Sequence, residues 1–164
     1  MPASPAANRK SPTPAHRRAL LAALAEDKGR VPAGTNSRVK DAMHLAHWVT
    51  EVTNTGRAAA GARWAGYDGP TFLSINSRGR RALLNDAGRT ALREAGPGGR
   101  LPEGTPRRIT RTLHRDGLIE YRNPNGTVHS TEGDDGVRGP LYVPHVTELG
   151  RRLVSGFPQV QRIV

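Results

Sequence analysis

Apolar residues along the chain recur with two different periods, and these predict short helices alternating with short strands. Leu20, Leu21 and Leu24 recur at helical spacing, and a similar pattern runs from 82 to 92. Shorter apolar runs have the length and residue types of strands, and they lie at 48–52, 71–75, 118–121 and 141–146. The chain is therefore predicted to belong to the α+β class.

The predicted elements occur twice in the same order. The turn "GRVPAGT" at 29–35 returns as "GRLPEGT" at 99–105, and the whole segment 29–73 aligns on 99–143 without a gap. After one inserted residue, "SRGRRAL" at 77–83 pairs with "ELGRRLV". Because apolar, Gly and Pro positions coincide over this length, we interpret the pattern as an internal duplication.

The duplication predicts two units with a common order of elements. Each unit has a helix, the repeated turn, a second helix, a strand, a Gly-rich excursion, a returning strand and a closing helix. Thr35 and Thr105 are predicted to cap the second helix, with Pro106 at its first position in unit two. The predicted organisation is a disordered Pro-, Ala- and Ser-rich arm, two units and a tail, at 1–15, 16–82, 83–157 and 158–164.

The segment 77–96 is predicted to be one helix shared by the two units. It would close unit one and open unit two, so that one chain acts as a pseudo-dimer. Gly88 and the pair Asn85-Asp86 are its weak points.

The second unit resembles the winged helix-turn-helix superfamily, in the manner of bacterial MarR- and PadR-type regulators. The residues that carry the resemblance are "RRITRTLHRDGLIEY" at 107–121 and "LYVPHVTELGRRL" at 141–153. The resemblance implies that 105–116 is a recognition helix and that 123–139 is a β-hairpin wing. The support helix before it is either reduced to the turn at 99–105 or replaced by a bend in the preceding helix, at Gly88.

The charge balance points to nucleic acid as the partner. The chain has 25 Lys and Arg against 14 Asp and Glu, for a net charge of +11, and it has no Cys. Arginine suits forked contacts to phosphate and guanine, although a basic surface can also simply aid solubility. With neither a secretory core nor a membrane-length apolar run, we expect a cytoplasmic, nucleoid-associated protein without a membrane partner.

Four arginines of the second unit are predicted to share one face of the 105–116 helix. At about 100° per residue, Arg107, Arg108, Arg111 and Arg115 lie within one quadrant, opposite Ile109 and Leu113. This arrangement suits a helix in a major groove. The alternative is an ordinary solvated face.

The corresponding face of the first unit is less basic, because it carries Asp41 and Leu45. We therefore expect unit two to supply most of the DNA affinity, and unit one to read a second half-site weakly or to bind a protein. Trp64 of the first wing is predicted either to contact DNA or to pack beneath its own wing. The full set of predicted DNA-binding residues is Arg107, Arg108, Thr110, Arg111, His114, Arg115, Arg122, Arg138, Ser37, Arg38, Lys40, His44, Arg57 and Arg63.

The chain contains no recognisable nucleophile–base pair or paired carboxylates, and we predict no enzymatic activity, cofactor or metal. The acidic run "EGDDG" at 132–136 is interpreted as a plain turn. The predicted function is sequence-specific binding of double-stranded DNA by a transcriptional regulator, as a monomer or homodimer. The alternatives are an accessory factor for plasmid or phage replication or recombination, and a protein-interaction adaptor with an acidic partner.

Overall fold

A computed structural model describes residues 11–129 and 142–156 and is of the mixed α+β class. The chain divides into two compact units, Met1–Leu83 and Leu84–Val164. The predicted boundary between 82 and 83 lies one residue from this division. No helix in the described part of the chain is long and apolar enough to cross a membrane.

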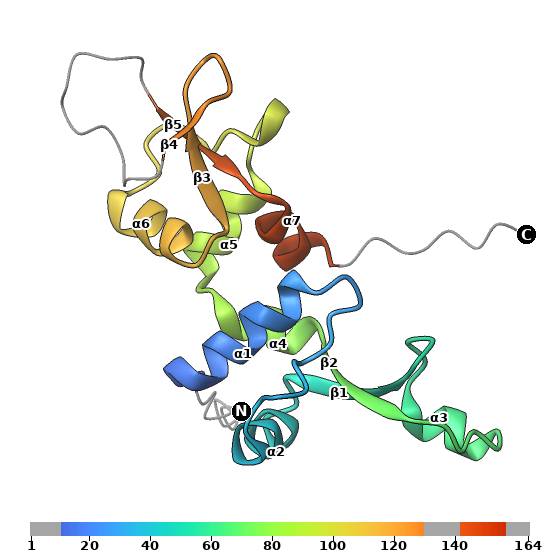
Figure 1. Ribbon diagram of the computed structural model, residues 1–164. Helices are drawn as coiled ribbons and strands as arrows, with labels where there is room; N and C mark the ends of the chain where they lie inside the picture. The colour runs from blue at the N-terminus through green and yellow to red at the C-terminus, as the bar shows by residue number, and fades with distance from the viewer. Residues whose placement is uncertain (1–10, 130–141, 157–164) are drawn as a thin grey trace, which may run out of the picture. The chain divides into compact units, whose positions relative to one another are not determined.

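Unit one places three helices around the base of a two-stranded hairpin (Figure 1). Its elements are α1 (Pro14–Ala25), α2 (Ser37–Leu45), β1 (Val49–Thr53), α3 (Ala59–Trp64), β2 (Thr71–Ile75) and α4 (Ser77–Leu83). Antiparallel pairing of β1 and β2 runs from Val49–Ile75 to Thr53–Thr71. Leu20, Leu24, Met43 and Leu83 are fully buried and form the core.

Unit two repeats this order around a three-stranded sheet. Its elements are α5 (Asp86–Arg93), a 3-10 turn (Pro97–Gly99), α6 (Arg107–Arg115), β3 (Ile119–Arg122), β4 (Val128–His129), β5 (Val143–Val146) and α7 (Glu148–Ser155). The strand order is β4-β3-β5, and all pairs are antiparallel. Leu113, Leu118, Ile119 and Leu153 are buried in its core.

The repeated turn has the same backbone role in both units, which its Gly and Pro content did not predict. Arg30 forms an isolated antiparallel bridge with Ser74, and Arg100 forms one with His145. In unit one, the amide of Val31 donates to the carbonyl oxygen of Leu73 at 2.8 Å. The turn therefore adds a third short segment beside β2 in unit one and a fourth beside β5 in unit two, and in neither unit does a helix lie between it and the helix that follows. The described segment between the 3-10 turn and α6 contains no further helix.

The predicted helix caps are wrong in both units. Asn36, not Thr35, caps α2, since its side chain accepts a hydrogen bond from the amide of Arg38 at 2.9 Å. In unit two, Pro106 occupies the N-cap position, and α6 begins at Arg107 without a side-chain cap. The hydroxyl of Thr105 instead donates to the carbonyl oxygen of Pro102 at 2.7 Å, which holds the turn together.

The predicted shared helix is also wrong. The segment 77–96 forms two helices, α4 and α5, with Leu84 and Asn85 between them. The side chain of Asn85 accepts a hydrogen bond from the amide of Gly88 at 2.9 Å and so caps a new helix. Gly88 therefore lies in the first turn of α5, where it takes part in the cap.

The predicted wing of unit one, residues 54–69, contains a helix that the sequence pattern did not predict. Helix α3 lies within the connection between β1 and β2, and Figure 1 shows it at the end of the hairpin away from α1 and α4. Buried Ala59 anchors it, beside a bridge between Ala58 and Val52. The six-residue segment is Ala- and Gly-rich and too short to show helical periodicity.

Candidate nucleic-acid interface

Helix α6 is held in unit two by one narrow buried face. Leu113 is fully buried and Thr110 is 7% exposed, while Ile109 is half-buried. The helix packs against α5 and β3. Its buried residues are three positions apart, so they lie on one side of the helix and leave the opposite side to solvent.

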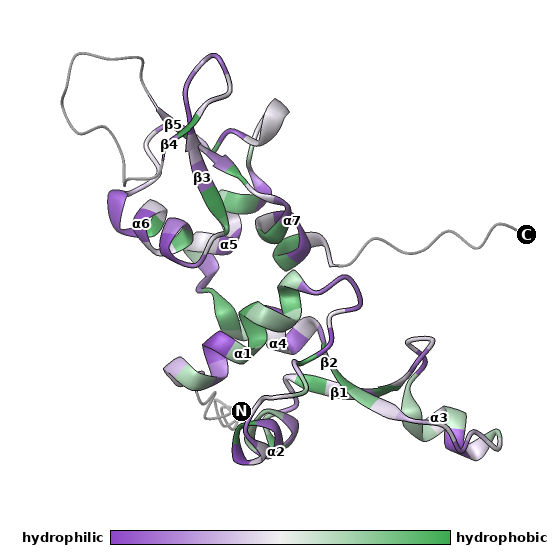
Figure 2. Ribbon diagram, viewed as in Figure 1, coloured by the Kyte–Doolittle hydropathy of each residue, from purple (hydrophilic) through white to green (hydrophobic). Residues whose placement is uncertain are grey.

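The solvent side of α6 carries the four predicted arginines, and all four are exposed: Arg107, Arg108, Arg111 and Arg115. No acidic residue lies within the helix, and Figure 2 shows it with hydrophilic and apolar stretches. The nearest carboxylate in sequence is that of Asp116, which lies 3.4 Å from Arg115 but has a side chain only 7% exposed. The exposed surface of α6 is therefore strongly cationic.

Two of the other predicted contacts in unit two have different roles. Thr110 is buried and its hydroxyl donates to the carbonyl oxygen of Arg107 at 3.0 Å, so its side chain is turned away from the exposed arginine face. His114 is half-buried, and its ring lies 4.9 Å from that of Tyr121. His114 therefore contributes to packing at the edge of the arginine face.

The predicted contacts beyond α6 are only partly accessible to a ligand. Arg122 is the last residue of β3 and is ion-paired with Glu120 on the same strand. Its charge is thus compensated within the protein. Arg138 and the acidic run at 132–136 lie outside the described residues.

The corresponding face of α2 in unit one is mixed in charge. Ser37, Arg38 and His44 are exposed, but so is Asp41. Lys40 donates from Nζ to the carbonyl oxygen of Ala33 at 2.7 Å, which ties it to the preceding turn. The two second helices thus have matching positions in their units but different surfaces.

The α2 face also presents an apolar side chain. Leu45 is 79% exposed at the end of the helix. At this position in the repeat, α6 carries Arg115.

The wing of unit one holds one exposed and one paired arginine. Arg57 is exposed, whereas Arg63 forms an ion pair with Glu51 at 2.9 Å. The hydroxyl of Thr71 also donates to Glu51. This hydrogen bond, followed by the charge of Arg63, holds the pKa of Glu51 below its ordinary value despite partial desolvation.

Arg30 is a residue at the base of this wing that the sequence reasoning missed. Its guanidinium lies 3.9 Å from the centre of the Phe72 ring and donates to the carbonyl oxygen of Asn54 at 2.9 Å. The internal duplication could have indicated Arg30, because Arg30 and Arg100 coincide in the repeat. The Gly and Pro content of that turn indicated only a structural role.

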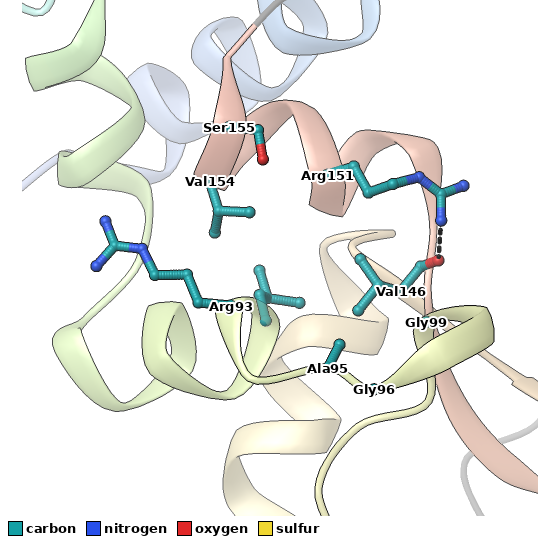
Figure 3. A pocket seen from close by; sticks show the side chains of 9 residues that line it. Arg93, Ala95, Gly96, Gly99, Val146, Arg151, Val154 and Ser155 are labelled. Carbon is teal, nitrogen blue, oxygen red and sulfur yellow. Dashed lines mark hydrogen bonds between the residues drawn. The ribbon is translucent and has the colours of Figure 1, made fainter.

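Unit two also contains a hollow of about 470 Å³ between the end of α5, the turn at 97–99 and α7 (Figure 3). Leu92, Val146 and Val154 supply apolar walls. The guanidinium groups of Arg93 and Arg151 point to opposite sides, and Arg151 is engaged by the carbonyl oxygen of Val146 and by Glu148. Because its polar groups do not converge on one point, the hollow lacks the arrangement typical of a ligand site.

No family model, curated protein or solved structure matches this chain.

Proposed function

We propose that the protein binds double-stranded DNA in a sequence-specific manner and acts as a transcriptional regulator, with α6 of unit two as its main reading element. The observation that carries the proposal is the exposed face formed by Arg107, Arg108, Arg111 and Arg115 on a helix without acidic residues. Arg115 is paired with Asp116, but the arginines of this face still repel one another, and a polyanion relieves that repulsion.

The dimensions of α6 suit this role. With its side chains an α-helix is about 10–12 Å in diameter, which fits the roughly 12 Å width of the major groove. Arginines at i, i+1, i+4 and i+8 of one face can divide their contacts between guanine edges and the flanking phosphates. In this proposal, α6 of unit two both positions the protein on the phosphates and reads the bases.

The two units are proposed to contribute unequally. Asp41 on α2 repels phosphate, so unit one adds little duplex affinity through that helix. The exposed side chain of Leu45 favours a second candidate function for α2, the docking of a protein partner. The chain would then bind DNA through unit two and a protein through unit one.

Selection of bound sequences from random duplex DNA tests the proposal. We expect enrichment of one motif, and an affinity that falls steeply as salt increases. Binding that depends on salt but enriches no motif would contradict sequence-specific regulation. The absence of duplex binding at low salt would contradict DNA binding altogether.

A further inference from the structure

The two tryptophans of the chain, both in unit one, have opposite environments. Trp48 is 8% exposed in the core, where its ring contacts that of His16 edge-on. Trp64 is 95% exposed, more than the other large exposed apolar residues of the described chain. An indole ring is one of the largest apolar surfaces a protein can present, and leaving it in water gains nothing for folding.

The segment that carries Trp64 is held by defined contacts with the hairpin. It ends helix α3, which the buried side chain of Ala59 anchors against the hairpin. Beyond the helix, the hydroxyl of Tyr67 donates to the carbonyl oxygen of Pro70 at 2.9 Å. A Cβ atom on Gly69 would lie 2.5 Å from that hydroxyl, so a larger residue there would displace the Tyr67 ring.

Several residues near Trp64 in the sequence are small and leave the space around its ring open. Gly61, Ala65 and Gly66 surround it in sequence, and a Cβ atom on either glycine would meet no atom within 4 Å. Figure 2 shows α3 mostly in pale apolar colours at the end of the hairpin. The end of the wing thus carries a large aromatic ring with Arg63 directly before it and small residues on the other side.

The hairpin and wing that carry Trp64 have more arginines than carboxylates. Arg30, Arg57 and Arg63 lie along the hairpin and its wing, against Glu51 and Asp68. Glu51 is already engaged by Arg63 and Thr71, and Arg57 is exposed. The charge favours an anionic partner for the wing.

We infer that Trp64 is an apolar wedge that enters the minor groove of duplex DNA and stacks at a base step, with Arg57 at a flanking phosphate. The inference rests on the proposed DNA-binding function. Proteins that bind the minor groove insert apolar side chains between base steps in this way, and the face of an indole ring stacks well on a base. The wing of unit one then contributes to DNA binding although α2 does not.

Self-association through the wing is the less favoured use of the same surface. Six helical residues extend about 9 Å. A stable dimer needs about 800 Å² of buried surface from each partner. Helix α3 is too small to supply that area.

Intrinsic fluorescence tests the inference, because Trp48 is buried and Trp64 is exposed. We expect saturating duplex DNA to alter the emission of the wild-type protein and to protect it from iodide, and the W64F variant to show neither effect. W64A should bind the duplex about tenfold more weakly, and W64F should retain most of the affinity. Since Trp64 makes little contact with the protein, both variants should keep the wild-type circular dichroism spectrum.

The possible failures are distinguishable. Unchanged Trp64 emission on a saturated duplex, or wild-type affinity in W64A, overturns the wedge while leaving the function of α6 intact. A stronger response to single-stranded DNA than to duplex overturns the minor-groove assignment. An effect of W64A on self-association alone assigns the wing to a second copy and overturns the inference. If the wild-type protein binds no duplex, the proposed function fails together with the wedge.

Discussion

Gly79 lies so close to Trp48 that a Cβ atom on the glycine would be 2.2 Å from the Trp48 carbonyl oxygen. The same oxygen accepts a hydrogen bond from the amide of Asn76 at 3.1 Å. Unit two repeats the relationship, since a Cβ atom on Gly150 would be 2.3 Å from the carbonyl oxygen of Leu118. The closing helix of each unit thus approaches the start of the central strand at a point where only glycine fits.

Alanine at either glycine should therefore destabilise its unit. We expect Gly79→Ala and Gly150→Ala each to lower the free energy of unfolding by about 1–3 kcal/mol or more, because backbone rather than a flexible side chain must move. Gly61→Ala is the matched control: it lies in α3 with open space around it, and it should raise stability by up to about 1 kcal/mol. Urea denaturation followed by circular dichroism measures all three. Equal effects at Gly61 and Gly79 would contradict the close approach.

The cap of α2 gives a second prediction. Asn36→Ala removes the acceptor for the Arg38 amide and should cost about 1 kcal/mol of stability. Thr35→Ala, one residue earlier, should cost clearly less, because Thr35 does not cap the helix. Thermal unfolding of the two variants distinguishes the positions. A larger loss of stability for Thr35→Ala than for Asn36→Ala would support Thr35 as the helix cap, as expected from the sequence.

The wing of unit one gives a prediction about pH. The hydrogen bond from Thr71, with the charge of Arg63, lowers the pKa of Glu51 in the folded state. The resulting stability is complete above the usual Glu pKa of about 4.3 and is lost as the pH falls through the lower folded value. Thr71→Val should move the pKa of Glu51 upward, as measured by NMR titration of its carboxyl carbon. An unchanged pKa of Glu51 in this variant would show that the Thr71 hydrogen bond is not the main cause of the lowered pKa.

The strands and the arginine face could be predicted from the sequence because both follow from local periodicity. The strand 71–75 was predicted with its observed bounds, and the strands at 48–52 and 118–121 were predicted to within one residue. The exposure of Arg107 followed from its position opposite Leu113 on the helix.

The remaining features depend on contacts that the pattern does not encode. Thr105 does not cap α6 because its hydroxyl bonds to Pro102 within the turn. Thr110 was assigned to the ligand, but its position on the helix is as close to Leu113 as to Arg107, at about 60° from each, and the structure buries it. Helix α3 was missed because its anchoring depends on the contact of Ala59 with the hairpin.

The affinity for the selected duplex of a variant carrying both Arg107→Ala and Arg111→Ala tests the central claim most directly. We predict that affinity falls at least about tenfold and that its dependence on salt becomes shallower by about one unit of slope for each phosphate that is no longer neutralised. The matched control is Arg81→Ala with Arg93→Ala, which removes two exposed arginines from α4 and α5 and should bind nearly as tightly as the wild-type protein. Wild-type affinity and an unchanged salt slope in the Arg107/Arg111 variant would contradict the account.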